Sequence, residues 1–143
     1  MMIPYLKCMI VVAAAVGLPP RVLPVLQAME GGSIGMVRAD TNGTADLGVM
    51  QVNTIWLPAL AARARLTAEE TRHRMINEPC FNIAAAALIM RVYLVETGGA
   101  LMPAIGDYHS HSQALNKAYQ VEAVRTASRL FLAGPASAAA PGR

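Results

Sequence analysis

The chain has 143 residues, of which 55% are apolar, 5% aromatic and 15% charged, and 26 are alanine. This composition favours one domain of closely packed helices, and it argues against disorder and against a membrane-spanning run of about 18–20 uncharged apolar residues. The net charge of +3 comes from scattered Lys and Arg residues without interleaved aromatics, so nucleic acid is not an expected partner.

The first apolar stretch, over 8–18, has two interpretations. It resembles the hydrophobic part of a short signal peptide, because one Lys precedes it and the alanines at 13–15 are a conceivable cleavage zone. We favour instead a first buried helix over 8–16, because the stretch leads directly into Pro19 and Pro20, which can end one helix and start the next.

Helical spacing of apolar residues predicts a second helix over 21–30, ended by Gly31 and Gly32. Glu30 then lies in the last helical turn, next to irregular backbone. Residues 31–48 are expected to form a loop or a small hairpin, because Asn42-Gly43 is the strongest short turn signal in the chain.

The rest of the chain is expected to be helical. A helix resumes from residue 52, and a capping box of Thr67 and Glu70 starts a short helix that runs to about 75. A long apolar helix over 80–96 is expected to be central and buried, followed by helices over 102–108 and from Ser112 to about 132. The predicted fold is mostly α with a small β-hairpin, as one domain over 1–133 and a disordered tail over 134–143.

Polar residues and glycines concentrate between Glu30 and Asn53. This stretch holds the carboxylates of Glu30 and Asp46 and ends in Gly48-Val49-Met50-Gln51-Val52-Asn53. An apolar helix and its C-terminal dipole both disfavour a charged Glu30, which suits a group that must donate a proton at neutral pH.

The pattern resembles the lysozyme-like superfamily, and most of all the specialised lytic transglycosylases associated with type IV secretion and conjugation. In that family a catalytic Glu closes a helix before Gly or Ser, and a Gly-x-Met-Gln-x-Asn segment follows, as here at 30–31 and 48–53. A block of Asn-Ile and small residues is matched at 82–87, with Ala where many relatives have Gly. The usual Ala-Tyr-Asn block is matched by Tyr108, with His109 in place of Asn, so the resemblance covers about residues 8–110.

The resemblance implies a lysozyme-like α+β fold and a peptidoglycan lytic transglycosylase that needs no cofactor. Glu30 would act as acid and then as base in cleaving the MurNAc–GlcNAc β-1,4 bond, with 1,6-anhydro-MurNAc formed in place of hydrolysis. The partners implied are peptidoglycan glycan strands and a secretion, conjugation or pilus machine. The enzyme would act as a monomer in the periplasm or cell envelope of a bacterium.

The resemblance also suggests substrate-binding residues, each with a structural alternative. Gln51 and Tyr108 would position the sugar and the carboxylate, although Tyr108 would also suit the core. Asn42 and Asn53 would line the cleft, although Asn53 is also a good helix N-cap. Asp46 is either a second catalytic carboxylate or, as we favour, a residue that holds the hairpin through backbone N–H groups.

The two cysteines are Cys8 and Cys80, and their spacing makes no zinc site. On residues alone, two buried thiols and one long-range disulfide remain equal alternatives. The family often carries cysteines at these two places, which favours the disulfide. No metal site is expected, because the histidines lack metal spacing with supporting carboxylates; they are His73, His109 and His111.

Two other functions remain open. One is a true hydrolase, or muramidase, that uses Glu30 together with Asp46. The other is a non-catalytic module that binds the wall or takes part in assembly. The single Trp, Trp56, is expected to belong to the core and not to form a sugar platform.

Overall fold

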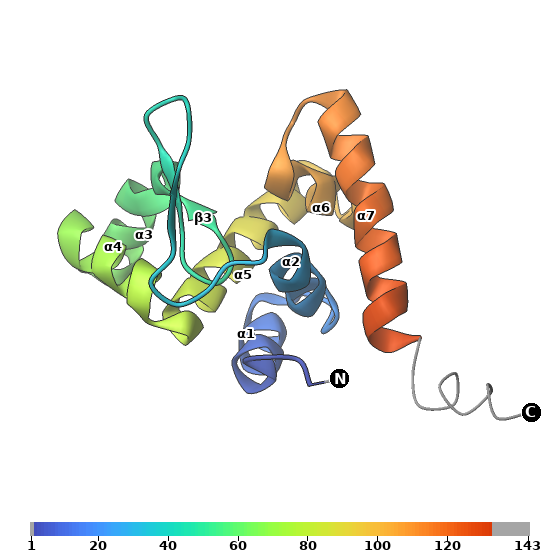
Figure 1. Ribbon diagram of the computed structural model, residues 1–143, viewed down its shortest axis with the longest axis horizontal. Helices are drawn as coiled ribbons and strands as arrows, with labels where there is room; N and C mark the ends of the chain where they lie inside the picture. The colour runs from blue at the N-terminus through green and yellow to red at the C-terminus, as the bar shows by residue number, and fades with distance from the viewer. Residues whose placement is uncertain (1, 133–143) are drawn as a thin grey trace, which may run out of the picture.

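The structure, a computed structural model, describes residues 2–132 (Figure 1). Within these residues, seven α-helices accompany one three-stranded antiparallel sheet, so the predicted mostly α fold with a small β-hairpin is confirmed. The helices are α1 (Leu6–Val16), α2 (Val22–Glu30), α3 (Leu57–Ala64), α4 (Ala68–Asn77), α5 (Pro79–Glu96), α6 (Leu101–His109) and α7 (Gln113–Phe131). The strands are β1 (Val37–Ala39), β2 (Ala45–Leu47) and β3 (Val52–Asn53), and the short 3-10 helix η1 (Thr54–Trp56) follows β3.

Helix α5 runs through the middle of the molecule. The sheet, α3 and α4 lie on one side of it and α6 and α7 on the other, with α1 beneath it and α2 between it and α7 (Figure 1). The side chains of Ile83, Ala86 and Met90 on α5 are fully buried, as expected for a central helix. The small side chains over 84–87 allow neighbouring elements to approach closely.

Among the described helices, α5 is the one that is long and apolar enough to cross a membrane, by length and composition alone. The sequence did not indicate a possible membrane span here, because the helix carries Arg91 and Glu96 and is therefore not an uncharged run. The core helix of a globular fold meets the same test, and half of the α5 span is buried against the rest of this fold.

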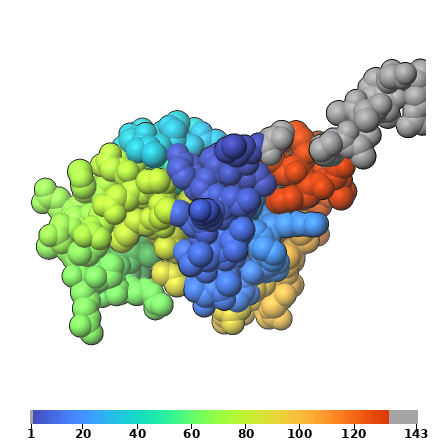
Figure 2. Space-filling view, turned by 90° about the horizontal axis from the view of Figure 1, so that it is seen from below, coloured from blue at the N-terminus to red at the C-terminus, as the bar shows by residue number. Residues whose placement is uncertain are grey.

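Helix α1 is only partly the buried helix that was predicted. It begins at Leu6, two residues earlier than expected, and it buries Met9 and Ala13. Ile10 and Val11 remain 49% and 67% exposed. Seen from below, α1 lies across the surface of the molecule (Figure 2).

The predicted hairpin forms between β1 and β2, with Val37 paired to Leu47 and Ala39 to Ala45. Its turn contains Gly43, whose φ of 85° lies in the left-handed region that glycine tolerates. The prediction that a helix begins at residue 52 is wrong at its start. Val52 and Asn53 instead form β3, which pairs with β2, and α3 begins only at Leu57.

The later helix start is explained by the local contacts of Asn53. Its side-chain oxygen accepts a hydrogen bond from Ile55 N at 2.9 Å and caps η1, so helical backbone starts after Asn53 and not before it. Val52 is buried and β-branched, and it extends the sheet. A two-residue strand gives too short a pattern to be recognised in the sequence.

The other helix ends agree closely with the sequence signals. The capping box of α4 is confirmed, with Thr67 Oγ1 accepting from Glu70 N and Glu70 Oε2 accepting from Thr67 N, both at 3.0 Å. Helix α4 ends at Asn77, two residues later than expected. Ser112 precedes α7, but its side chain makes no capping hydrogen bond. The predicted tail lies outside the described residues.

Asn82 joins the first turn of α5 to the loop after β2. Its amide nitrogen donates to the carbonyl oxygens of Leu47 and Met75, each at 2.8 Å, and its amide oxygen accepts from Met50 N at 2.9 Å. Gly48 has a φ of 69°, and a Cβ there would collide with Asn82 and with the Met75 carbonyl oxygen. The fully buried Asn82 side chain therefore fixes the 47–50 backbone.

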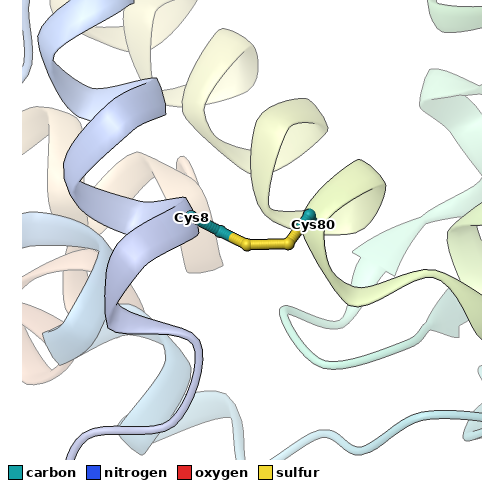
Figure 3. The surroundings of a disulfide bond; sticks show 2 residues. All are labelled: Cys8 and Cys80. Atoms are coloured by element: carbon teal, nitrogen blue, oxygen red, sulfur yellow. A yellow bond between two sulfur atoms is a disulfide. The ribbon is translucent and has the colours of Figure 1, made fainter.

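Cys8 of α1 and Cys80 of α5 form a disulfide, with their Cα atoms 5.6 Å apart (Figure 3). Both cysteines of the chain are thereby used, and neither is a free thiol. The bond holds the surface helix α1 against the start of the central helix.

We expect the Cys8→Ser/Cys80→Ser double variant to lose about 3 kcal/mol of unfolding free energy, because the disulfide closes a long loop and restricts the unfolded chain. Urea denaturation of oxidised wild type against the variant measures the difference. A reducing agent should lower the stability of the wild type and leave the variant unchanged. A difference of less than about 0.5 kcal/mol would contradict a stabilising role.

Candidate active site

A cleft of about 400 Å³ lies between the sheet and the α6–α7 side of the molecule. This volume is in the range of small-ligand sites. Four carboxylates line the cleft, while no lysine or arginine among the described residues does, so the positive net charge is carried elsewhere. The lining residues are Glu30, Asp40, Asp46, Gln51, Val52, Asn53, Ile55, Trp56, Ile89, Tyr93, Asp107, Tyr108, His109, Ser110 and His111.

Glu30 enters the cleft from the last turn of α2, where sequence analysis placed it. Gly31, with a φ of 64°, ends the helix directly after it. The half-buried carboxyl accepts a hydrogen bond from the Tyr119 hydroxyl at 2.5 Å. Burial raises the pKa of Glu30, and the charge of Asp46 adds to this, while the Tyr119 hydrogen bond and the charges of His109 and Arg38 oppose it. Because the rise prevails, Glu30 is suited to carry a proton.

Tyr119 is the most important residue that the sequence did not reveal. It lies on α7, is buried, and meets Glu30 across 89 positions of sequence. Burial and the Glu30 charge raise the pKa of Tyr119 far above its usual range, so its hydroxyl remains a donor. The His109 ring stacks on the Tyr119 ring, with centroids 4.9 Å apart and planes at 4°. His109 thus supports the tyrosine that holds Glu30.

Tyr108 lies in the cleft wall but does not contact Glu30 through its hydroxyl. The hydroxyl donates to the carbonyl oxygen of Met50 at 2.9 Å. This bond ties α6 to the loop that Asn82 fixes from the other side. The contact with Glu30 that was expected of Tyr108 is made in this structure by the Tyr119 hydroxyl.

Asp46 and Asn53 belong to one polar cluster beside Glu30. The Asn53 amide nitrogen lies 3.0 Å from Asp46 Oδ1, 3.1 Å from Asp40 Oδ2 and 2.9 Å from Thr44 Oγ1. Burial and the neighbouring Asp40 charge raise the pKa of Asp46. Asp46 is therefore held through the Asn53 side chain and not, as expected, through backbone N–H groups.

Gln51 lines the cleft in a strained conformation. Its φ of 52° is unusual for a residue other than glycine. Its amide nitrogen donates to the Gly48 carbonyl oxygen at 2.9 Å, while its buried Oε1 has no hydrogen-bond partner among the described residues. Strain and an unpaired acceptor are features that functional sites retain.

Asn42 is the predicted site residue that the structure does not bring to the cleft. It lies exposed in the β1–β2 turn, where its side-chain oxygen accepts from Thr44 N at 3.1 Å and from Thr44 Oγ1 at 2.6 Å. Asn42 therefore shapes the hairpin. Trp56, expected in the core, is half-buried against it but also lines the cleft, and its ring centroid lies 5.9 Å from that of Tyr93.

One group of side chains could hold a metal ion. The ligand atoms of Glu96, Asp107 and His111 all lie within 4.8 Å of one another. The sequence did not indicate this group, because Glu96 and His111 are far apart along the chain and only the packing of α5 against α6 brings them together.

Searches of the whole chain against protein-family models and against curated proteins found no match.

Proposed function

We propose that the cleft binds a peptidoglycan glycan strand and cleaves its MurNAc–GlcNAc β-1,4 bond without consuming water. The observation that carries the proposal is the state of Glu30. It is a half-buried carboxyl with a raised pKa, held by a tyrosine hydroxyl at the edge of a cleft of ligand size. The family resemblance of residues 8–110 supplies the substrate class.

The proposed reaction uses Glu30 twice. The protonated carboxyl gives its proton to the bridging oxygen as the bond from that oxygen to C1 of MurNAc breaks. The resulting carboxylate then takes the proton of the C6 hydroxyl of the same sugar, whose oxygen bonds to C1 and closes the 1,6-anhydro ring. The nucleophile is part of the substrate, so it gains from proximity and the carboxyl returns protonated.

Residues in and beside the cleft have positioning roles in this proposal. Tyr119 keeps the Glu30 carboxyl in one orientation, and Tyr108 keeps the Met50 segment in place. Gln51 lines the cleft in a strained conformation and is a candidate contact for the sugar. The negative charge of Asp46 raises the pKa of Glu30 and so favours its protonated form.

The cellular setting is part of the same proposal. A disulfide between the only two cysteines supports an oxidising compartment such as the periplasm, where peptidoglycan is found. There the enzyme would open the wall locally for a secretion, conjugation or pilus machine.

Mass analysis of muropeptides released by the full chain tests the reaction. We expect anhydro ends, which are lighter by one water than reducing ends. Reducing-end products would identify a hydrolase, for which Asp46 is the available second carboxylate. Absence of any products would indicate a wall-binding module and would refute catalysis.

We expect Tyr119→Phe to move the pH profile of activity as well as to lower it. The proposed reaction needs protonated Glu30, so activity declines as pH rises through the pKa of Glu30. Loss of the hydroxyl removes a contact that lowers this pKa, so the decline should shift to higher pH. Activity at the optimum should fall about tenfold to a hundredfold, because the carboxyl is less well placed.

Tyr5→Phe is the matched control, because Tyr5 lies at the start of α1 and its hydroxyl makes no contact with Glu30. Its profile should match that of the wild type. If Tyr119→Phe lowered activity without moving the alkaline limb, Tyr119 would have only a packing role.

A further inference from the structure

We propose that Glu96, Asp107 and His111 form a binding site for a divalent transition metal of the zinc type. They come from three places: the last residue of α5, the last turn of α6 and the loop between α6 and α7. His111 Nε2 lies 3.5 Å from Glu96 Oε1 and 3.9 Å from Asp107 Oδ2. Asp107 and His111 also line the cleft, but the proposal assigns them no part in wall cleavage.

The spacing suits a shared ion. Two atoms that each bind a tetrahedral zinc ion at about 2.1 Å lie about 3.4 Å apart. The two distances from His111 are close to this value, and all three ligand atoms fall within 4.8 Å of one another. Small side-chain movements would therefore complete three bonds, and solvent can supply the fourth because Glu96 and His111 are half-exposed.

The Asp107 carboxylate is already oriented for binding. Its side chain is 13% exposed, and its Oδ1 accepts a hydrogen bond from the Asn116 amide at 2.8 Å, which leaves Oδ2 toward His111. The Asn116 amide also donates to the Ser110 carbonyl oxygen at 3.1 Å, so it is itself held. Hydrogen bonds of this kind around a ligand raise metal affinity.

The ring of His111 is held as well. It packs edge-on against the Tyr93 ring, with the two ring centroids 5.3 Å apart and the ring planes at 70°.

Neither Glu96 nor Asp107 forms an ion pair with a lysine or arginine among residues 2–132, so their charges have no cationic partner except His111. One imidazole with two carboxylates favours zinc-type ions over Mg²⁺ and Ca²⁺, which prefer all-oxygen sites.

Calorimetric titration of the chelator-treated full chain with ZnCl₂ tests the site. We expect one ion per chain for the wild type. We expect three single variants each to weaken zinc binding at least tenfold: His111→Ala, Glu96→Gln and Asp107→Asn. Loss of a residue that only hydrogen-bonds to a metal ligand already lowers metal affinity by about this factor, so loss of a ligand should cost at least as much. His73→Ala is the matched control, because His73 is exposed on α4 and outside the group, and its binding should equal that of the wild type.

Nuclear magnetic resonance of the imidazole nitrogens identifies the ligand directly. Of the three histidines in the chain, His111 alone should shift on addition of Zn²⁺. A shift of His73 or His109 in its place, unchanged affinity in His111→Ala, or equally strong binding of Mg²⁺ would each overturn the proposal. Neither measurement depends on enzyme activity, so failure here and failure of the proposed function are distinguishable.

Discussion

Glu30→Gln is expected to reduce the release of anhydro-muropeptides by about 10²–10⁴-fold, the range typical for loss of a general acid. Glutamine has nearly the same shape but carries no transferable proton. It can still accept a hydrogen bond from Tyr119, so the local geometry should persist. The rate of product release from purified peptidoglycan, followed by mass spectrometry, measures the loss.

The same change should not destabilise the fold. The pKa of Glu30 is raised in the folded protein, so the wild type loses stability as pH increases from the unfolded value of 4.5 through the folded pKa. The glutamine variant has no such loss and should be at least as stable as the wild type at pH 7. Thermal unfolding at several pH values gives the comparison.

Glu122→Gln provides the control, because Glu122 is exposed on α7 and, within residues 2–132, its carboxylate pairs only with Arg125, at 2.7 Å. It should retain full activity. Wild-type activity in Glu30→Gln would remove the basis for any catalytic role of the cleft.

Asn82→Ala is expected to lower the free energy of unfolding by about 4 kcal/mol. The substitution removes the Asn82 hydrogen bond from three backbone groups: the carbonyl oxygens of Leu47 and Met75 and the N–H of Met50. Each unpaired buried group costs about 1–3 kcal/mol. Urea denaturation followed by circular dichroism measures the change.

Activity should fall in Asn82→Ala even at temperatures where the variant stays folded. Met50 accepts the Tyr108 hydrogen bond, so release of the Met50 segment loosens the cleft wall. Asn77→Ala is the control, because the Asn77 side chain is exposed and, in the described part of the chain, bonds only to His73. It should change stability by less than about 0.5 kcal/mol. Equal effects of the two substitutions would show that Asn82 is not a structural anchor.

Features that depend on neighbouring residues were predictable from the sequence. The capping box of Thr67 and Glu70, the glycine stop after Glu30 and the turn at Gly43 each need only a few adjacent residues, and each was found where it was expected. The strand at 52–53 was missed because its partner strand, not its own pattern, determines it.

The site was predictable only in part, for the same reason. The sequence could place Glu30 at a helix end, but not the hydroxyl that holds it, since Tyr119 lies on an otherwise ordinary helix far along the chain. Asn42 carried a turn signal and proved to serve the turn alone. Long-range packing decides such pairings, and no local pattern encodes it.

The disulfide has a further consequence for proteolysis. It closes a covalent loop over residues 8–80 that includes Glu30 and the whole sheet, whereas Tyr119 and His109 lie outside it. The exposed turn at 41–43 is the kind of loop tip that proteases cut first. A single cut there would produce two fragments that stay joined until the disulfide is reduced, so the nicked protein would run as one band without reductant and as two with it.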